Sequence, residues 1–483
     1  MLLSSFSFLA FFTALAITYY AVPHRFRWPL LLAASLYFYA TFSPNYVVLL
    51  LGITLIAYWG GRGVEAADST EARRALLTVS AAAVVGALLA FKYYDFFVTS
   101  LDAALASVGL GGSTPLFPRL DLVLAVGLSF YTFSCLSYLV DVNARRLPAE
   151  RHFGHFALYV SFFPKLLAGP IERAKPFLSQ IRRPVQFSAS GVTLGLQVML
   201  WGLFKKVVIA DHLAGFVDTI YAQPTFSSPA DLVLATYFFA FQLYCDFSGY
   251  SDMAIGASKI LGIDLMENFR RPYLSTSVPE FWAKRWHLSL AGWFRDYMYV
   301  PMGGSRVSRI RRYGNVLAVF LVSGLWHGAN WTFVVWGGVN GLYQVLSLMT
   351  RRARSRLAEM IAVPAPAKTV LDVLVTFHLI LVTWVFFRAE SLSDAFAILG
   401  RATGSLVQLP SLIWARIMAG GVLFSLLLIA LLISVEIIDE RRPLWERLAA
   451  QPRYVRWGVY YLLVFGLIVL GTWQGQAFVY MQF

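Results

Sequence analysis

The sequence has few charged residues and only two cysteines. Lys, Arg, Asp and Glu make up 14% of its 483 residues, whereas a soluble domain usually carries about 25%. Apolar residues make up 58%, and the mean hydropathy is +0.63. A soluble domain of this size would need polar surface that the sequence lacks. These figures exclude a disordered chain, a nucleic-acid-binding domain and a disulfide-stapled scaffold, and they favour a polytopic membrane protein.

Several familiar signatures are also missing. Cys135 and Cys245 both lie inside apolar stretches, so we interpret them as small core residues and expect no metal site. The first apolar stretch, 1–22, has no positive n-region and no small-residue cleavage site, so we interpret it as a retained span. Walker A, nucleophile-elbow and His-Glu-x-x-His motifs do not occur, which leaves no support for a P-loop ATPase, a serine hydrolase or a zinc protease.

Long apolar runs dominate what is present. A helix needs about 20 mostly apolar residues to cross a bilayer. Backbone groups in lipid must be paired within their own segment, so such runs are helices. The sequence therefore predicts an all-α polytopic membrane protein, organised as one integral membrane domain over 1–483. Candidate spans are 2–22, 28–42, 45–61, 75–98, 120–140, 190–210, 231–249, 314–327, 330–349, 369–387, 417–438 and 456–474.

Positive charge is concentrated in a few loops. The net charge is 40 − 26 = +14, and the interval 264–313 alone holds nine Lys and Arg against four acids. The intervals 99–118 and 211–230 hold no Lys or Arg. Basic loops of membrane proteins face the cytoplasm and meet anionic lipid. We therefore expect 264–313 on the cytoplasmic side and both neutral loops outside.

Two stretches do not fit simple spans. The segment 153–169 has basic residues on both sides and is interrupted by Pro164, Lys165 and Gly169. We expect it to be re-entrant or interfacial, because irregular backbone at membrane depth is tolerated only against protein or a water-filled cavity. Lys205 and Lys206 stand late in the span 190–210. Either they face a polar interior or the span ends before them.

A third stretch, 314–349, is too long for one span and has the length of a helical hairpin. Near its turn stands Gly324-Leu325-Trp326-His327-Gly328, in which glycines loosen the helix on both sides of His327. Ionisable side chains within a membrane are rare and usually functional. A neutral imidazole near its unperturbed pKa of about 6.5 suits a general base. His327 is therefore the leading candidate, and the alternative is a structural histidine satisfied by a carbonyl.

Other polar residues leave more alternatives open. His287 lies among bulky aromatic and basic residues, which is typical of an interfacial segment. It is either an anchor or a residue that positions substrate. Asp246 and Asp252 close an apolar run. They either pair with arginines of 264–313 or orient a histidine.

Two classes of function fit these residues. One is an enzyme that takes a phosphate-bearing substrate from the cytoplasm. The other is a transporter or flippase of a polymer precursor with a proton-relay histidine. A transporter usually has inverted repeats or paired broken helices. Only one broken helix is evident, near His327, which favours the enzyme.

Six segments, taken together and in this order, resemble the membrane-bound O-acyltransferase family, most of all its bacterial alginate O-acetyltransferase branch. Three of these segments are 285–290, with Arg285-Trp286-His287, 293–304, with Arg295-Asp296-Tyr297, and 324–331, with Trp326-His327-Gly328. The other three are 129–133, 163–173 and 244–252. These motifs define a core of about 120–340.

The resemblance implies a fold and a pair of site residues. The family fold is a ring of about 11–12 transmembrane helices, with re-entrant segments around a central funnel. The family's near-invariant histidine corresponds to His327, and its second motif histidine corresponds to His287. Both are therefore expected catalytic residues.

The resemblance also implies an activity and its partners. A multi-pass protein of the bacterial inner membrane would pass an acetyl group from cytoplasmic acetyl-CoA to alginate or a related exopolysaccharide. Acetyl-CoA would be a substrate, with no bound cofactor and no metal. The expected partners are the lipid bilayer, a periplasmic SGNH-type O-acetyltransferase and the polysaccharide synthesis machinery, with no nucleic acid.

Within such a reaction, His327 would act as general base or would itself carry the acetyl group. Arg295, Arg306 and Lys284 would meet the phosphates of CoA, and the turn Gly303-Gly304 adds backbone N–H groups beside Arg306. Donors to the developing oxyanion are expected among Asn330 and the tryptophan N–H groups.

Overall fold

A computed structural model of the chain describes residues 1–110, 116–360, 364–442, 444–473 and 478–479. These residues form helices joined by loops, with no strand among them, and the predicted all-α class is confirmed. The chain divides into two compact units, one of 1–192 with 257–266 and one of 193–256 with 267–483. Helices α10 (Ala189–Phe204) and α12 (Pro229–Ile260) each contribute residues to both units.

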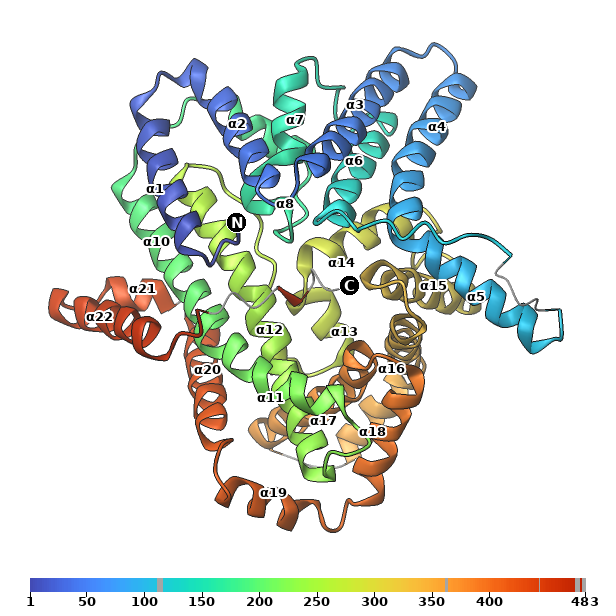
Figure 1. Cartoon of the computed structure of the whole chain (residues 1–483), viewed down its shortest axis with the longest axis vertical. Helices are drawn as coiled ribbons and strands as arrows, with labels where there is room; N and C mark the ends of the chain where they lie inside the picture. Colours follow the sequence, from blue (N-terminus) through green and yellow to red (C-terminus); the bar gives the residue numbers. More distant parts are fainter. Residues whose placement is uncertain (111–115, 361–363, 443, 474–477, 480–483) are drawn as a thin grey trace. The chain divides into compact units, whose positions relative to one another are not determined.

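In the first unit, α3 packs beside α4 and α6, and α2 packs against α7 and α8 (Figure 1). Aromatic rings fill the space between these helices, and Phe163 contacts Phe8 and Phe38. The helices of this unit are α1 (Phe6–Ala21), α2 (Arg27–Ala40), α3 (Pro44–Ala66), α4 (Thr70–Leu88), α5 (Tyr94–Ser107), α6 (Leu128–Asn143), α7 (Phe153–Ser161), α8 (Phe163–Leu166) and α9 (Ala174–Ile181).

The second unit holds a large apolar core contributed mainly by α12 and α17. Helix α16 packs along both α15 and α17 (Figure 1). Besides the shared helices, this unit contains α11 (Asp211–Ala222), α13 (Val278–Glu280), α14 (Leu288–Phe294), α15 (Arg309–His327), α16 (Trp331–Met360), α17 (Ala365–Arg388), α18 (Leu392–Gly404), α19 (Leu409–Met418), α20 (Leu423–Arg441), α21 (Leu444–Ala449) and α22 (Arg453–Leu470).

Within the described ranges, five helical stretches are long and apolar enough to cross a membrane by length and composition. A sixth arises if α18 and α19, bent by 100°, count as one span. Other stretches expected as spans form shorter helices or carry more charge, such as α1 with 16 residues. The five are Pro44–Ala66, Thr70–Ser107, Ala189–Ala222, Ala365–Arg388 and Arg453–Leu470.

The two irregular stretches are explained by local structure. In 153–169, α7 has nine residues and α8 has four. Neither can cross a hydrocarbon core of about 30 Å at 1.5 Å per residue. The stretch 189–222 is helical throughout, with π-helical geometry at Lys205–Ala210. The helix therefore continues past Lys205 and Lys206, and both lysines are buried.

Two further π-helical turns flank the segment that contains His287. They are Phe281–Arg285 and Arg295–Tyr299, one before and one after α14. Such turns are rare and occur mostly at functional sites. Their position supports the expectation that the motif-rich interval is more than a connecting loop.

Candidate active site

His327 is the last residue of α15, at the turn of the predicted hairpin. Its side chain is buried, with 3% of the residue exposed. The imidazole packs among aromatic rings, with centroid distances of 4.9 Å to Trp326, 5.0 Å to Trp336 and 5.5 Å to Phe387. An imidazole in such surroundings is shielded from water, which strengthens any hydrogen bond made there.

Glycines bring the two arms of the hairpin close enough to form this cage. A Cβ at Gly324 would lie 2.3 Å from the carbonyl oxygen of Phe333, and one at Gly337 would lie 2.3 Å from that of Phe320. Only residues without a side chain permit this approach of α15 to α16. Gly324, noted beside His327 in the sequence, thus acts through helix packing and holds α15 against α16.

His287 is buried beside the same tryptophan as His327. Its ring centroid lies 6.1 Å from Trp326 and 4.7 Å from Phe247. Its backbone φ of 44° is left-handed, and strained conformations of this kind occur often at functional sites. The structure therefore brings the two predicted catalytic histidines into contact with one indole ring, that of Trp326. We call His287, Trp326, His327 and Trp336 the histidine–tryptophan cluster.

Burial also determines the charge state of His287. Desolvation lowers the pKa of His287 from 6.5 to about 3. The imidazole is therefore neutral near pH 7, where it can act as a hydrogen-bond donor or acceptor but not as a cation.

Asn268 holds the backbone around His287 and was not anticipated from the sequence. Its carbonyl oxygen accepts the N–H of Leu288 at 2.9 Å, and its Oδ1 accepts the hydroxyl of Ser289 at 2.9 Å. Its Nδ2 donates to Ser251 Oγ at 3.1 Å. Asn268 is fully buried. A single asparagine in a polar interval carries no sequence signal of this kind, because its partners come from α12 and α14.

An ion-pair network fixes the same interval to α20. Arg285 Nε lies 2.7 Å from Glu280, and its Nη2 lies 2.9 Å from Glu440. Arg271 pairs with Asp439 and, through Nε at 2.6 Å, with Glu440. These arginines belong to the motif-rich interval, so their charges anchor the loop that carries His287.

Lysines, and not arginines of 264–313, pair with the two aspartates of α12. Lys205 Nζ lies 2.7 Å from Asp252, and Lys206 Nζ lies 2.6 Å from Asp246 and 2.7 Å from Asp211. Asp246 also accepts the backbone N–H of Val479 at 2.7 Å. Of the two alternatives left open for Lys205 and Lys206, the polar interior is therefore correct. We call Lys205, Lys206, Asp211, Asp246 and Asp252 the lysine–aspartate cluster.

The three basic residues expected to bind CoA phosphates lie at the surface, unlike the histidines. Lys284 and Arg306 are exposed. The Arg295 side chain is 69% exposed and pairs with Asp296 at 2.8 Å. Exposed cations of this kind are available to an anionic ligand that approaches from solvent.

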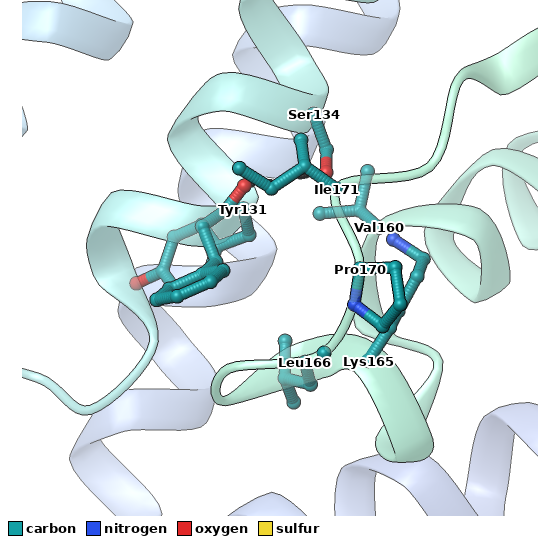
Figure 2. A pocket seen from close by; sticks show the side chains of 9 residues that line it. Tyr131, Ser134, Val160, Lys165, Leu166, Pro170 and Ile171 are labelled. Atoms are coloured by element: carbon teal, nitrogen blue, oxygen red, sulfur yellow. Dashed lines mark hydrogen bonds between the residues drawn. The ribbon is translucent and has the colours of Figure 1, made fainter. Parts of the chain in front are cut away.

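A second candidate site lies in the first unit, beside the interrupted segment 153–169. Figure 2 shows Lys165 extending from α8 alongside Pro170 toward Val160. The amine lies 4.6 Å from the ring centroid of Tyr159, and burial lowers the pKa of Lys165 to about 8. The space between these side chains has no cavity of the 300–1,000 Å³ typical of ligand pockets. We therefore interpret Lys165 as a structural cation held against an aromatic face.

A multi-pass helical protein with two buried histidines around one indole ring has the features of a membrane-embedded enzyme. Comparison with known proteins supports this class. The family model of the membrane-bound O-acyltransferase family matches residues 75–387. The chain therefore belongs to the membrane-bound O-acyltransferase family, and it is an acyltransferase.

Individual relatives agree with this assignment. The chain is 39% identical to a probable alginate O-acetylase AlgI from Azotobacter vinelandii, over 81% of this chain and 75% of that protein. It is 35% identical to a peptidoglycan O-acetyltransferase from Helicobacter pylori, over 77% and 73%. It is 26% identical to a teichoic acid D-alanyltransferase from Bacillus subtilis, over 46% and 58%. Enzyme, and not transporter, is thus the class that the relatives support.

Proposed function

We propose that this protein takes an acetyl group from acetyl-CoA at the cytoplasmic face of the bacterial inner membrane and passes it outward. The final acceptor is alginate or a related exopolysaccharide, and 1–483 acts as one integral membrane domain. Relatives at 38% and 39% identity are named as alginate O-acetylases. The peptidoglycan and teichoic acid relatives are less similar, at 35% and 26%. Because the alginate O-acetylases are the more similar of these relatives, the identities support an exopolysaccharide as the acceptor.

The observation that carries the proposal is the burial of His327 in an aromatic cage at the end of a glycine-packed hairpin. Acyl transfer from a thioester needs a hydroxyl that loses its proton as it attacks the carbonyl carbon. An imidazole shielded from water can take that proton, which contributes roughly 10²–10⁴-fold to the rate. His287 is neutral and shares Trp326 with His327, so it can position the acceptor or donor by hydrogen bonding.

The test is replacement of His327 by Ala in the full chain, with insertion and folding measured in the same membranes. We expect polymer acetylation to fall by roughly 10²–10⁴-fold while the melting temperature stays close to that of the parent. His378 provides a matched control, because Tyr237 Oη and the carbonyl oxygen of Leu374 bond both of its ring nitrogens. Full acetylation by the folded His327→Ala protein would refute the assignment.

His327 can also serve as a nucleophile that carries the acetyl group before passing it on. The two roles differ when labelled acetyl-CoA is supplied without acceptor. A relay leaves up to one acetyl group per protein on an imidazole, together with an equal release of CoA. A general base leaves the protein unlabelled under the same conditions.

The donor contacts are tested through the exposed cations. An exposed ion pair contributes about 0.2–1 kcal/mol, so Arg306→Gln should raise the KM for acetyl-CoA by at most roughly fivefold and leave kcat unchanged. Arg351, on α16 and also exposed, provides the control. An equal effect of Arg351→Gln would indicate general surface attraction and not a phosphate contact.

The acceptor and the partners are tested in cells. Deletion of the protein should remove acetyl groups from the exopolysaccharide and leave acetylation of peptidoglycan unchanged. We propose that a periplasmic SGNH-type O-acetyltransferase completes the transfer beside the polysaccharide synthesis machinery. Loss of that second enzyme should therefore abolish polymer acetylation although this protein still consumes acetyl-CoA.

A further inference from the structure

Asn330 and several tryptophans near the hairpin carry N–H groups that could donate to an oxyanion, and they differ in exposure and in the partners they already have. Asn330 Nδ2 donates to the carbonyl oxygen of Glu390 at 3.0 Å, and its Oδ1 accepts the N–H of Thr332. Asn330 therefore caps the start of α16. Trp331 is 52% exposed, outside the water-excluded region where such a donor is effective.

The tryptophans around His327 differ in whether their indole N–H groups have an acceptor. The indole N–H of Trp282 donates to Asn340 Oδ1 at 3.0 Å. Within the described part of the chain, the indole N–H groups of Trp336 and Trp384 have no acceptor, although only 1% and 0% of these residues is exposed. Nearly all buried donors in folded proteins are paired. A buried donor that has no acceptor within the protein is available to an acceptor on a ligand.

Trp336 is the one of these two that contacts the proposed base. Its ring centroid lies 5.0 Å from that of His327, with the ring planes at 85°. Trp384 stacks on Trp336, with ring centroids 6.0 Å apart and an interplanar angle of 17°. Close packing at Gly324 and Gly337 fixes the spacing between His327 and Trp336, so the donor is held in place before any ligand binds.

We infer that the indole N–H of Trp336 is the hydrogen-bond donor to the acyl carbonyl oxygen during transfer at His327. The inference rests on the proposed function and adds a catalytic residue to it. In the first step the acceptor hydroxyl oxygen bonds to the thioester carbon, His327 takes the hydroxyl proton, and the C=O electron pair moves to oxygen. The N–H of Trp336 stabilises that oxyanion. Collapse then breaks the C–S bond, and the thiolate receives the proton from His327.

The experiment compares Trp336→Phe with Trp282→Phe in membranes that contain the full chain, with acetyl-CoA as donor. Loss of one oxyanion donor lowers kcat by roughly 10²–10³-fold in enzymes of known mechanism. We expect that loss for Trp336→Phe, with the KM for acetyl-CoA within about threefold of the parent. Trp282→Phe removes a ring that packs against Trp336 from outside the histidine–tryptophan cluster and whose N–H is already bonded, so its kcat per folded molecule should stay within about threefold.

A second variant separates the N–H from the shape of the ring. Replacement of Trp336 by 3-benzothienylalanine keeps the bicyclic ring and puts sulfur where the N–H was. The inference predicts the same loss of kcat as in Trp336→Phe. A folded benzothienylalanine protein with parental kcat would overturn it.

Failure of the inference is distinguishable from failure of the proposed function. Parental Trp336→Phe activity beside an inactive His327→Ala protein overturns only the role of Trp336. A parent protein that neither releases CoA nor transfers acetyl overturns the proposed function and the inference together.

Discussion

The lysine–aspartate cluster and the histidine–tryptophan cluster both lie in the second unit, but they differ in whether their buried hydrogen-bond donors have acceptors. Each lysine amine lies within 2.8 Å of a carboxylate or hydroxyl oxygen. In the histidine–tryptophan cluster, the indole of Trp336 packs against His327, and its N–H has no acceptor among the described residues. Satisfied buried charges maintain structure, whereas groups held ready for a ligand serve chemistry. We therefore assign a structural role to the lysine–aspartate cluster and a catalytic role to the histidine–tryptophan cluster.

Breaking the lysine–aspartate cluster should have the largest effect on stability. Removal of one partner of a buried ion pair costs about 3–5 kcal/mol. Because the Asp252 side chain is 27% exposed, we expect Lys205→Met to fall at the low end of that range. Lys205→Met combined with Asp252→Asn should recover part of the loss. Thermal unfolding in detergent measures both, and an undiminished melting temperature for Lys205→Met would show that the pair contributes nothing.

Separating the two arms of the hairpin should have an intermediate effect on stability and should also lower activity, because His327 lies at the end of one arm. A Cβ at Gly324 meets a backbone oxygen, and overpacking of this kind costs about 1–3 kcal/mol. Gly324→Ala should therefore lower both the melting temperature and acetyl transfer per folded molecule.

Gly314 is the matched control, because it lies on the same helix and a Cβ there meets nothing within 4 Å. Gly314→Ala should be neutral or slightly stabilising, by up to about 1 kcal/mol. Equal effects of the two replacements would argue against a special role for the close approach at His327.

Titration of His287 should have the smallest effect at neutral pH, because its contribution appears only below about pH 6.5. Burial lowers the pKa of His287 from 6.5 to about 3. Between these values the unfolded chain binds a proton that the folded chain does not, so stability falls as the pH falls below 6.5. His287→Gln removes this contribution. We expect the melting temperature to fall less steeply from pH 6.5 to about pH 4.5 in the variant than in the parent. Parallel curves would contradict the burial of a neutral imidazole.

The helical class and the hairpin could be predicted because they depend on local pattern. Apolar runs and the position of Gly324 and Gly328 indicated two arms with His327 at their turn, and α15 and α16 have this arrangement. The interruptions in 153–169 likewise indicated a segment that does not span, and α7 is too short to do so.

What escaped prediction depends on contacts between distant segments. Asp246 and Asp252 were expected either to pair with arginines of 264–313 or to orient a histidine, but their partners stand some forty residues earlier, on the π-helical turn at Lys205 and Lys206. Nothing in the sequence around Trp336 distinguishes it from Trp282. Only the packing shows that one N–H is bonded to Asn340 and the other is not.

The most direct test measures acetyl transfer per folded molecule for His327→Ala and Lys205→Met side by side. The account predicts that His327→Ala keeps its melting temperature and loses transfer by at least about 100-fold. It predicts that Lys205→Met has a lower melting temperature than the parent but the same rate of acetyl transfer per folded molecule. The reverse pattern, with active His327→Ala and inactive but stable Lys205→Met, would place the chemistry in the lysine–aspartate cluster and contradict the account.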